Sequence, residues 1–128
     1  SPLGPPPTGW SGSLEPGQEV ELPSGLGWLS LEGAADGGIA CSAVSGQISV
    51  RFGASGQSLR LSGRQGAHSI RNLFQEAGVV PWMRPRLPIL VSAGRTLAIA
   101  GVGVAGWAAA PPGSEALSLR WRASPPLR

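Results

Sequence analysis

The sequence contains no lysine, and all ten of its basic residues are arginines. A lysine nucleophile, a lysine Schiff base and the lysine of a phosphate-binding loop are therefore excluded. His68 and Asp36 are the only histidine and the only aspartate, so a multi-histidine metal site is excluded as well. A Ser-His-Asp triad would need both of them, and no nucleophile elbow accompanies them. We therefore expect no catalytic residue and no metal site in this chain.

Cysteine and long apolar runs are also scarce. Cys41 is the single cysteine, so no intrachain disulfide forms, and a reducing compartment fits. No histidine or basic residue is near it in the sequence, which favours a buried, inert thiol. The longest uncharged apolar run, residues 97–110, is too short and too rich in glycine and alanine to span a bilayer. We expect a cytoplasmic protein without a membrane partner, and, because the chain starts at Ser1, a piece of a longer protein.

The charges that are present divide unevenly along the chain. Residues 1–36 hold five acidic residues and no arginine, whereas residues 37–128 hold all ten arginines and only two glutamates. The second part is therefore strongly basic, which favours an anionic partner, with nucleic acid first. An ordinary soluble surface that is rich in arginine explains the charge equally well, and the charge by itself does not separate the two.

The chain divides into a linker and one domain. Residues 1–17 contain five prolines and four glycines, which is typical of an extended linker, with Trp10 docked on the body. Residues 18–128 form a single domain of ordinary size, with 41% of the whole chain hydrophobic.

Alternating patterns dominate the domain and predict strands. Two of them form a hairpin with glutamates on its wet face, and a later pair is joined by a tight turn at residues 92–95. The predicted strands cover residues 19–22, 29–32, 48–52, 58–61, 89–91, 96–99 and 117–122. One helix is predicted at residues 70–77, capped by Ser69 and ended by Gly78. We therefore predict an α+β fold, a mainly antiparallel sheet with one principal helix packed on it.

Residues 101–106 match G-x-G-x-x-G and follow a predicted strand. A dinucleotide site needs a helix to begin there, and Pro111-Pro112 would stop it almost at once. The acidic residue expected about 20 positions later is missing too. We interpret this segment as a glycine-rich strand or bulge.

Two arginine-bearing segments flank the predicted helix. Residues 63–66 offer free backbone N–H groups and Arg64 near a helix N-terminus, which favours a phosphate, although an ordinary loop explains them too. In residues 81–88 the prolines predict extended backbone, with Trp82, Arg84 and Arg86 on one side. Two interpretations follow. Trp82 stacks on a base or ribose beside the arginines, or it fills the core beneath the helix while the guanidinium groups face outward, and we favour the second.

The segment at residues 69–90 reads SIRNLFQEAGVVPWMRPRLPIL. It resembles the C-terminal domain of bacterial tRNA(Ile)-lysidine synthetase, which has S-L-K-K-L-F-Q-E followed by G-V-P-P-W-x-R-D-R-x-P-L-L. The resemblance extends over about residues 48–104. Arg71 keeps the charge of the family's first lysine, whereas Asn72 replaces its second lysine and Pro85 replaces the aspartate between the two arginines. The lost cation lowers the RNA affinity expected of the helix or shifts binding to Arg64.

The resemblance implies a definite role. The parent enzyme uses ATP and Mg to adenylate the wobble cytidine of the isoleucine tRNA with a CAU anticodon, and lysine then displaces AMP. That chemistry belongs to an N-terminal catalytic domain with an S-G-G-x-D-S loop, which this sequence lacks. The chain is thus expected to be non-catalytic, to hold no cofactor, and to grip the tRNA for that domain.

The arginines of this chain are the expected RNA contacts, because RNA is read largely through its phosphates and 2′-hydroxyls. The primary candidates are Arg64, Arg71, Arg84 and Arg86, and the secondary ones are His68, Arg51 and Arg60. The alternative is a protein-interaction or structural module whose arginines dock an acidic partner or another part of the same enzyme.

Overall fold

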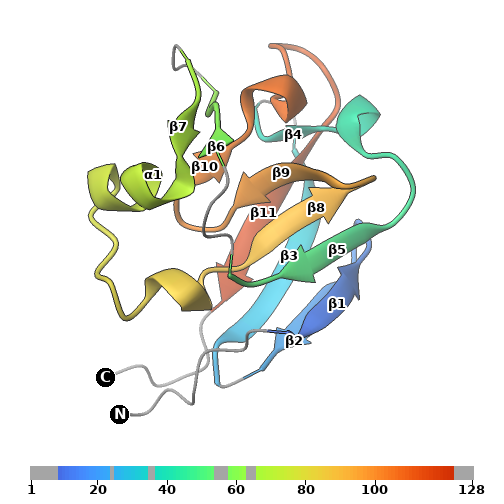
Figure 1. Ribbon diagram of the computed structural model, residues 1–128. Coiled ribbons are helices and arrows are strands. Elements are labelled where there is room, and N and C mark those ends of the chain that lie inside the picture. Colours follow the sequence, from blue (N-terminus) through green and yellow to red (C-terminus); the bar gives the residue numbers. More distant parts are fainter. Residues whose placement is uncertain (1–8, 24, 35–36, 54–57, 63–65, 123–128) are drawn as a thin grey trace.

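A computed structural model describes residues 9–23, 25–34, 37–53, 58–62 and 66–122 (Figure 1). Three antiparallel sheets account for its strands. The strands are β1 (Ser11–Leu14), β2 (Glu19–Leu22), β3 (Gly27–Ala34), β4 (Ile39–Ala40), β5 (Ile48–Arg51), β6 (Ser58–Leu59), β7 (His68–Ser69), β8 (Ile89–Ser92), β9 (Arg95–Ile99), β10 (Gly103–Val104) and β11 (Ala116–Arg122). The helices are α1 (Ile70–Glu76) and the 3₁₀ helices η1 (Cys41–Ala43), η2 (Arg84–Arg86) and η3 (Gly106–Ala108).

The two larger sheets pack face to face. The five-stranded sheet has the order β1-β5-β8-β9-β10 and the four-stranded sheet the order β2-β3-β11-β4, while β6 and β7 form a separate ribbon. Figure 1 shows β5 and β8 in front of β3 and β11. Val50 and Leu90 of the first sheet and Leu29 and Leu31 of the second are fully buried in the same core cluster. One hydrophobic core between two sheets therefore holds the domain together.

The prediction of an α+β fold is wrong, because the described chain is dominated by its sheets. Its one α-helix has seven residues and lies beside the β6-β7 ribbon at the edge of the molecule (Figure 1). In the described part of the chain the second sheet closes the core, and α1 adds Ile70, Leu73 and Phe74 to it. The alternating patterns found the main strands, but they did not indicate that the strands divide into two stacked sheets.

The first predicted hairpin is confirmed as β2 and β3. Glu19 is paired with Ser30 and Glu21 with Trp28, and both glutamates are exposed. The adjacent strand β11 is antiparallel to β3, and its two arginines form exposed ion pairs with the hairpin. Arg120 contacts Glu32 at 2.8 Å and Arg122 contacts Glu19 at 3.0 Å. The acidic leading segment thus offsets two arginines of the basic body.

The second predicted hairpin is confirmed as β8 and β9. Ala93 and Gly94, its central residues, have φ of 52° and 78°. Positive φ at both positions is the geometry of a type I′ turn, which matches the twist of the flanking strands. Both strands carry buried residues along most of their length, so this hairpin forms the middle of the five-stranded sheet.

The helix forms where its sequence predicts. The Ser69 hydroxyl accepts from the backbone N–H of Asn72 at 3.1 Å, which caps the first turn. Gly78, at φ 75°, ends the helix, because only glycine adopts this conformation readily. The N–H groups of Gly78 and Val79 donate to the carbonyls of Gln75 and Phe74, at 3.2 and 2.9 Å, which is the Schellman pattern.

One strand lies where the sequence predicts a linker, and another strand is shorter than the sequence predicts. Ser11–Leu14, inside the predicted linker, pair with β5 as β1. Trp10 packs on Phe52, with ring centroids 5.6 Å apart, as expected of a residue that docks this segment. The predicted strand at residues 58–61 is shorter, since only Ser58–Leu59 pair with β7. Residues 1–8 are outside the described part of the chain.

Two smaller predictions have different outcomes. Residues 101–106 form a turn, the short strand β10 and the start of η3, as the interpretation as a glycine-rich strand requires. Cys41 is exposed at the start of η1 rather than buried. The 3₁₀ turn directs this side chain outward, and composition alone could not reveal that turn.

Candidate nucleic-acid interface

The segment that follows α1 is a compact turn, so the prediction of extended backbone is wrong. The N–H of Met83 donates to Val80 at 3.0 Å, and that of Arg84 donates to Pro81 at 3.3 Å. The 3₁₀ helix η2 follows directly, with proline in its first turn. Proline fixes φ near −65°, a value that suits turns and the first turn of a helix as well as extended chain. Figure 1 shows this segment running from α1 to η2 along one side of the molecule.

The two arginines of this segment donate hydrogen bonds to backbone carbonyls of the same turn. The Nε of Arg84 donates to the carbonyl of Val79 at 3.0 Å, and an Nη of Arg86 donates to the carbonyl of Trp82. Both side chains are half-buried. A guanidinium has five donors in a rigid fork, so one donor can fix its position while others are directed elsewhere. The acceptor of Arg84 is a carbonyl oxygen, which carries no formal charge to neutralise its guanidinium.

Trp82 is exposed, which overturns the interpretation that we favoured. The residue is 61% exposed, and Val80 is 43% exposed; they are the exposed large hydrophobics of the described chain. Leu73 and Phe74 of the helix and Leu87 after the turn are buried in the core cluster instead. The turn at residues 80–84 carries Trp82 away from the core. The other interpretation, an aromatic surface beside arginines, agrees with this geometry.

The remaining primary candidates are on or before the helix. Arg71 is exposed on the first turn of α1, two residues after the cap. One continuous segment, residues 70–86, runs from α1 through the turn to the 3₁₀ helix η2, and we term it the Trp82 segment. It contains Arg71, Trp82, Arg84 and Arg86. Arg64 lies outside the described residues.

The secondary candidates are more dispersed. His68 is half-buried in β7, paired with Leu59, and precedes the helix cap directly. Arg60 is exposed, and its guanidinium lies against Gly106, where an added Cβ would meet it at 2.8 Å. Arg51 is exposed at the end of β5. These three residues come from different strands and loops and do not share the Trp82 segment.

The sequence patterns missed two arginine–aromatic contacts, that of Arg122 with Trp28, at 4.7 Å to the ring centroid, and that of Arg95 with Trp107. The guanidinium carbon of Arg95 is 3.8 Å from the ring centroid of Trp107. The two residues are 12 positions apart, and only the packing of η3 against β9 brings them together. The one signal in the sequence was an arginine in a hairpin turn.

Two further features of the described residues are absences. They contain no group of three or more histidine, cysteine, aspartate or glutamate side chains that could hold a metal ion. Across the same residues, no helix combines the length and the apolar character that a membrane crossing requires.

Comparison with known proteins gives consistent results. A family model described as "TilS substrate C-terminal domain" matches residues 48–121. A tRNA(Ile)-lysidine synthase of Vibrio cholerae serotype O1 is 37% identical over 97 residues, which are 76% of this chain and 22% of that protein. One of Methylococcus capsulatus is 48% identical over 65 residues, which are 51% of this chain and 14% of that protein. The chain thus spans about a fifth of the length of the first relative.

The fold has a solved counterpart. A structure described as "Crystal structure of TILS C-terminal domain" superposes with a TM-score of 0.71 and 24% sequence identity. The match covers 89% of this chain and 96% of the other. At this level of identity the likeness concerns the fold.

Proposed function

Because the chain belongs to the family of TilS substrate C-terminal domains, we propose that it is the non-catalytic RNA-binding part of a tRNA(Ile)-lysidine synthase. It holds an isoleucine tRNA with a CAU anticodon while a separate N-terminal domain attaches lysine to the wobble cytidine. ATP and Mg act in that domain. The attachment of lysine takes place in the cytoplasm, where the tRNA is.

The observation that carries this proposal is an exposed tryptophan on an arginine-bearing turn. Trp82 projects from residues 80–84 with 61% of its surface exposed, although a tryptophan is normally highly buried. An exposed aromatic beside arginines can stack on a base or ribose while the guanidinium groups contact phosphates.

The arginines of the Trp82 segment are preorganised for such a contact. The bond from Arg84 to the carbonyl of Val79 fixes its side chain before any ligand arrives. Less side-chain entropy is then lost on binding, so more of the phosphate interaction contributes to affinity. Arg120 and Arg122 of β11 differ from Arg84, because each of them is paired with a glutamate.

The charge of the segment supports an anionic ligand. The Trp82 segment, residues 70–86, contains Arg71, Arg84 and Arg86 and the single acidic residue Glu76. Double-stranded RNA is recognised mainly through shape, phosphates and 2′-hydroxyls. A basic turn that projects one aromatic ring is suited to the side of an RNA helix next to an unpaired base.

The test is binding of the isoleucine tRNA by a double variant, Arg84→Glu with Arg86→Glu, compared with the unmodified chain. Reversing both charges is expected to abolish measurable binding at physiological salt. Arg120→Gln is a control for the loss of one exposed arginine outside the Trp82 segment, and it should bind nearly as the parent does. Since Arg84 also holds the turn, circular dichroism must show that the double variant is folded. A folded double variant that binds as tightly as the parent would remove both residues from the interface.

A further inference from the structure

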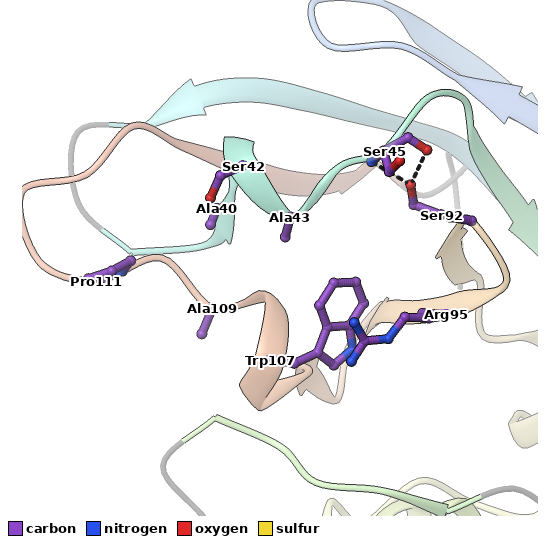
Figure 2. A pocket seen from close by; sticks show the side chains of 10 residues that line it. Ala40, Ser42, Ala43, Ser45, Ser92, Arg95, Trp107, Ala109 and Pro111 are labelled. Atoms are coloured by element: carbon purple, nitrogen blue, oxygen red, sulfur yellow. Dashed lines mark hydrogen bonds between the residues drawn. The ribbon is translucent and has the colours of Figure 1, made fainter.

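A cleft of about 560 Å³ opens between η1, η3 and the turn that joins β8 to β9 (Figure 2). Its size is within the range of ligand sites, about 300–1,000 Å³. The residues that line it include one charged side chain, Arg95, and one aromatic side chain, Trp107; the others are alanines, serines and a proline. It shares no lining residue with the Trp82 segment.

One wall of the cleft is a flat cationic surface. The Arg95 guanidinium lies over the Trp107 ring, with 3.8 Å from its central carbon to the ring centroid. The indole Nε1 donates to the carbonyl of Thr96 at 2.9 Å, which fixes the plane of the ring. Figure 2 shows the indole rising into the opening with the arginine laid across it. This surface is therefore formed before a ligand arrives.

The rest of the cleft is lined by small side chains, and one hydrogen-bonded serine connects its two sides. The Ser92 hydroxyl is buried and joins the two sides at one end of the cleft. It accepts from the backbone N–H of Ser45 and donates to the Ser45 carbonyl, both at 2.9 Å. Ala43 and Ala109 project only methyl groups toward the opening (Figure 2). The arginine–tryptophan stack therefore shares the cleft with small side chains only among its described lining residues.

We infer that this cleft binds one unpaired nucleotide of RNA, an inference that rests on the proposed RNA-binding function. The base lies against the arginine–tryptophan surface and the small side chains, and a neighbouring phosphate contacts the edge of the Arg95 guanidinium. Proteins recognise unpaired RNA bases by stacking them on aromatic rings and guanidinium planes. The described residues of the lining include no carboxylate that would repel the phosphate.

The experiment uses the chain labelled with ¹⁵N and two RNA probes, tetrauridylate and a blunt 12-base-pair duplex. Tetrauridylate is expected to shift the Trp107 indole N–H resonance, which is assigned by its loss in Trp107→Phe. The duplex, which has no unpaired base, should leave that resonance in place.

Two variants test the cleft in different ways. Arg95→Gln removes the cation from an exposed position, and Ser42→Trp fills the cleft from an exposed position while Arg95 stays. Each should weaken tetrauridylate binding roughly 5-fold or more, the effect of losing one base stack. Arg120→Gln removes the same charge outside the cleft and is a surface change of little effect on stability. It should bind tetrauridylate within about 2-fold of the parent.

Three results would overturn the inference. If both variants bind tetrauridylate as the parent does, while the chain still binds tRNA, the cleft is not a nucleotide site and the proposed function stands. If the chain binds neither tRNA nor tetrauridylate, both proposals fail. If a polyglutamate peptide shifts the Trp107 resonance and tetrauridylate does not, the cleft belongs to an acidic protein partner instead.

Discussion

Replacing Trp82 with alanine separates RNA binding from folding. The side chain is largely exposed, but the backbone carbonyl of Trp82, not its ring, accepts the bond from Arg86. The substitution therefore removes the stacking surface and leaves this hydrogen bond available. Trp82→Phe is the companion variant, because it keeps a smaller aromatic plane at the same position.

The size of each effect follows from the exposure of the residue. A tryptophan buries about 200 Å² when it is fully packed, and Trp82 is already 61% exposed. The remaining two fifths, about 80 Å², contributes at most about 2 kcal/mol at 25 cal/mol per Å². Loss of one base stack costs about 1–3 kcal/mol of binding, which is roughly a 5- to 150-fold weaker affinity.

The assay is fluorescence anisotropy with labelled isoleucine tRNA, at a temperature where every variant is folded, alongside urea unfolding. We expect Trp82→Ala to bind at least about 5-fold more weakly, with Trp82→Phe between it and the parent. Val80→Ala, which trims the other exposed apolar residue of this turn, should change affinity little. Parent-like affinity of Trp82→Ala would refute the stacking role. A loss of stability near the 3–5 kcal/mol of a buried aromatic would refute the exposure argument.

Three further predictions concern the helix. Arg71→Gln removes an exposed cation from α1, so the plot of log K against log salt should become shallower by about 1, and an unchanged slope would exclude this residue from the interface. Ser69→Ala deletes the cap on the Asn72 N–H and should cost about 1 kcal/mol in urea unfolding, whereas Ser69→Asp should retain most of the stability; equal stability of all three would disprove the cap. Gly78→Ala forces a side chain into φ 75° and should cost about 1 kcal/mol or more. Gly33→Ala, with no positive φ and open space around its Cβ position, is its control and should be nearly neutral; similar losses at both glycines would contradict the strain argument.

The sequence predicted the elements that depend on neighbouring residues, namely the helix and the central hairpin. The cap at Ser69, the glycine at Gly78 and the spacing of Ile70, Leu73 and Phe74 define the helix within ten residues. The Ala93-Gly94 turn likewise determines the central hairpin. In both cases neighbouring residues supply the hydrogen bonds and the conformations, so the sequence contains the information directly.

The features that were missed depend on distant contacts. The two-residue strands β4 and β7 are too short for any alternation, and only their partners make them strands. The division into two stacked sheets depends on pairings such as β3 with β11, about 90 positions apart, which alternation cannot reveal. The stack of Arg95 on Trp107 arises in the same way.

At the candidate site, the sequence indicated which residues to consider but not the environment of Trp82. Arg84 and Arg86 were predicted to be RNA contacts from their type and spacing, and Arg71 from the family resemblance. The structure brings Arg84 and Arg86 together on η2, and their contact with RNA stays a prediction. The environment of Trp82 was misjudged, because a proline-rich segment fits either an extended chain or a turn. The deciding hydrogen bonds, such as that from Arg84 to Val79, are side-chain contacts that a pattern does not contain.

The central claim is that this domain binds tRNA through arginine–phosphate contacts, and the salt dependence of its binding to the isoleucine tRNA tests it most directly. If about four phosphates are neutralised, log K should fall linearly with log salt concentration, with a slope of roughly −3 to −4. Binding that does not change with salt, or no binding at low salt, would contradict the claim.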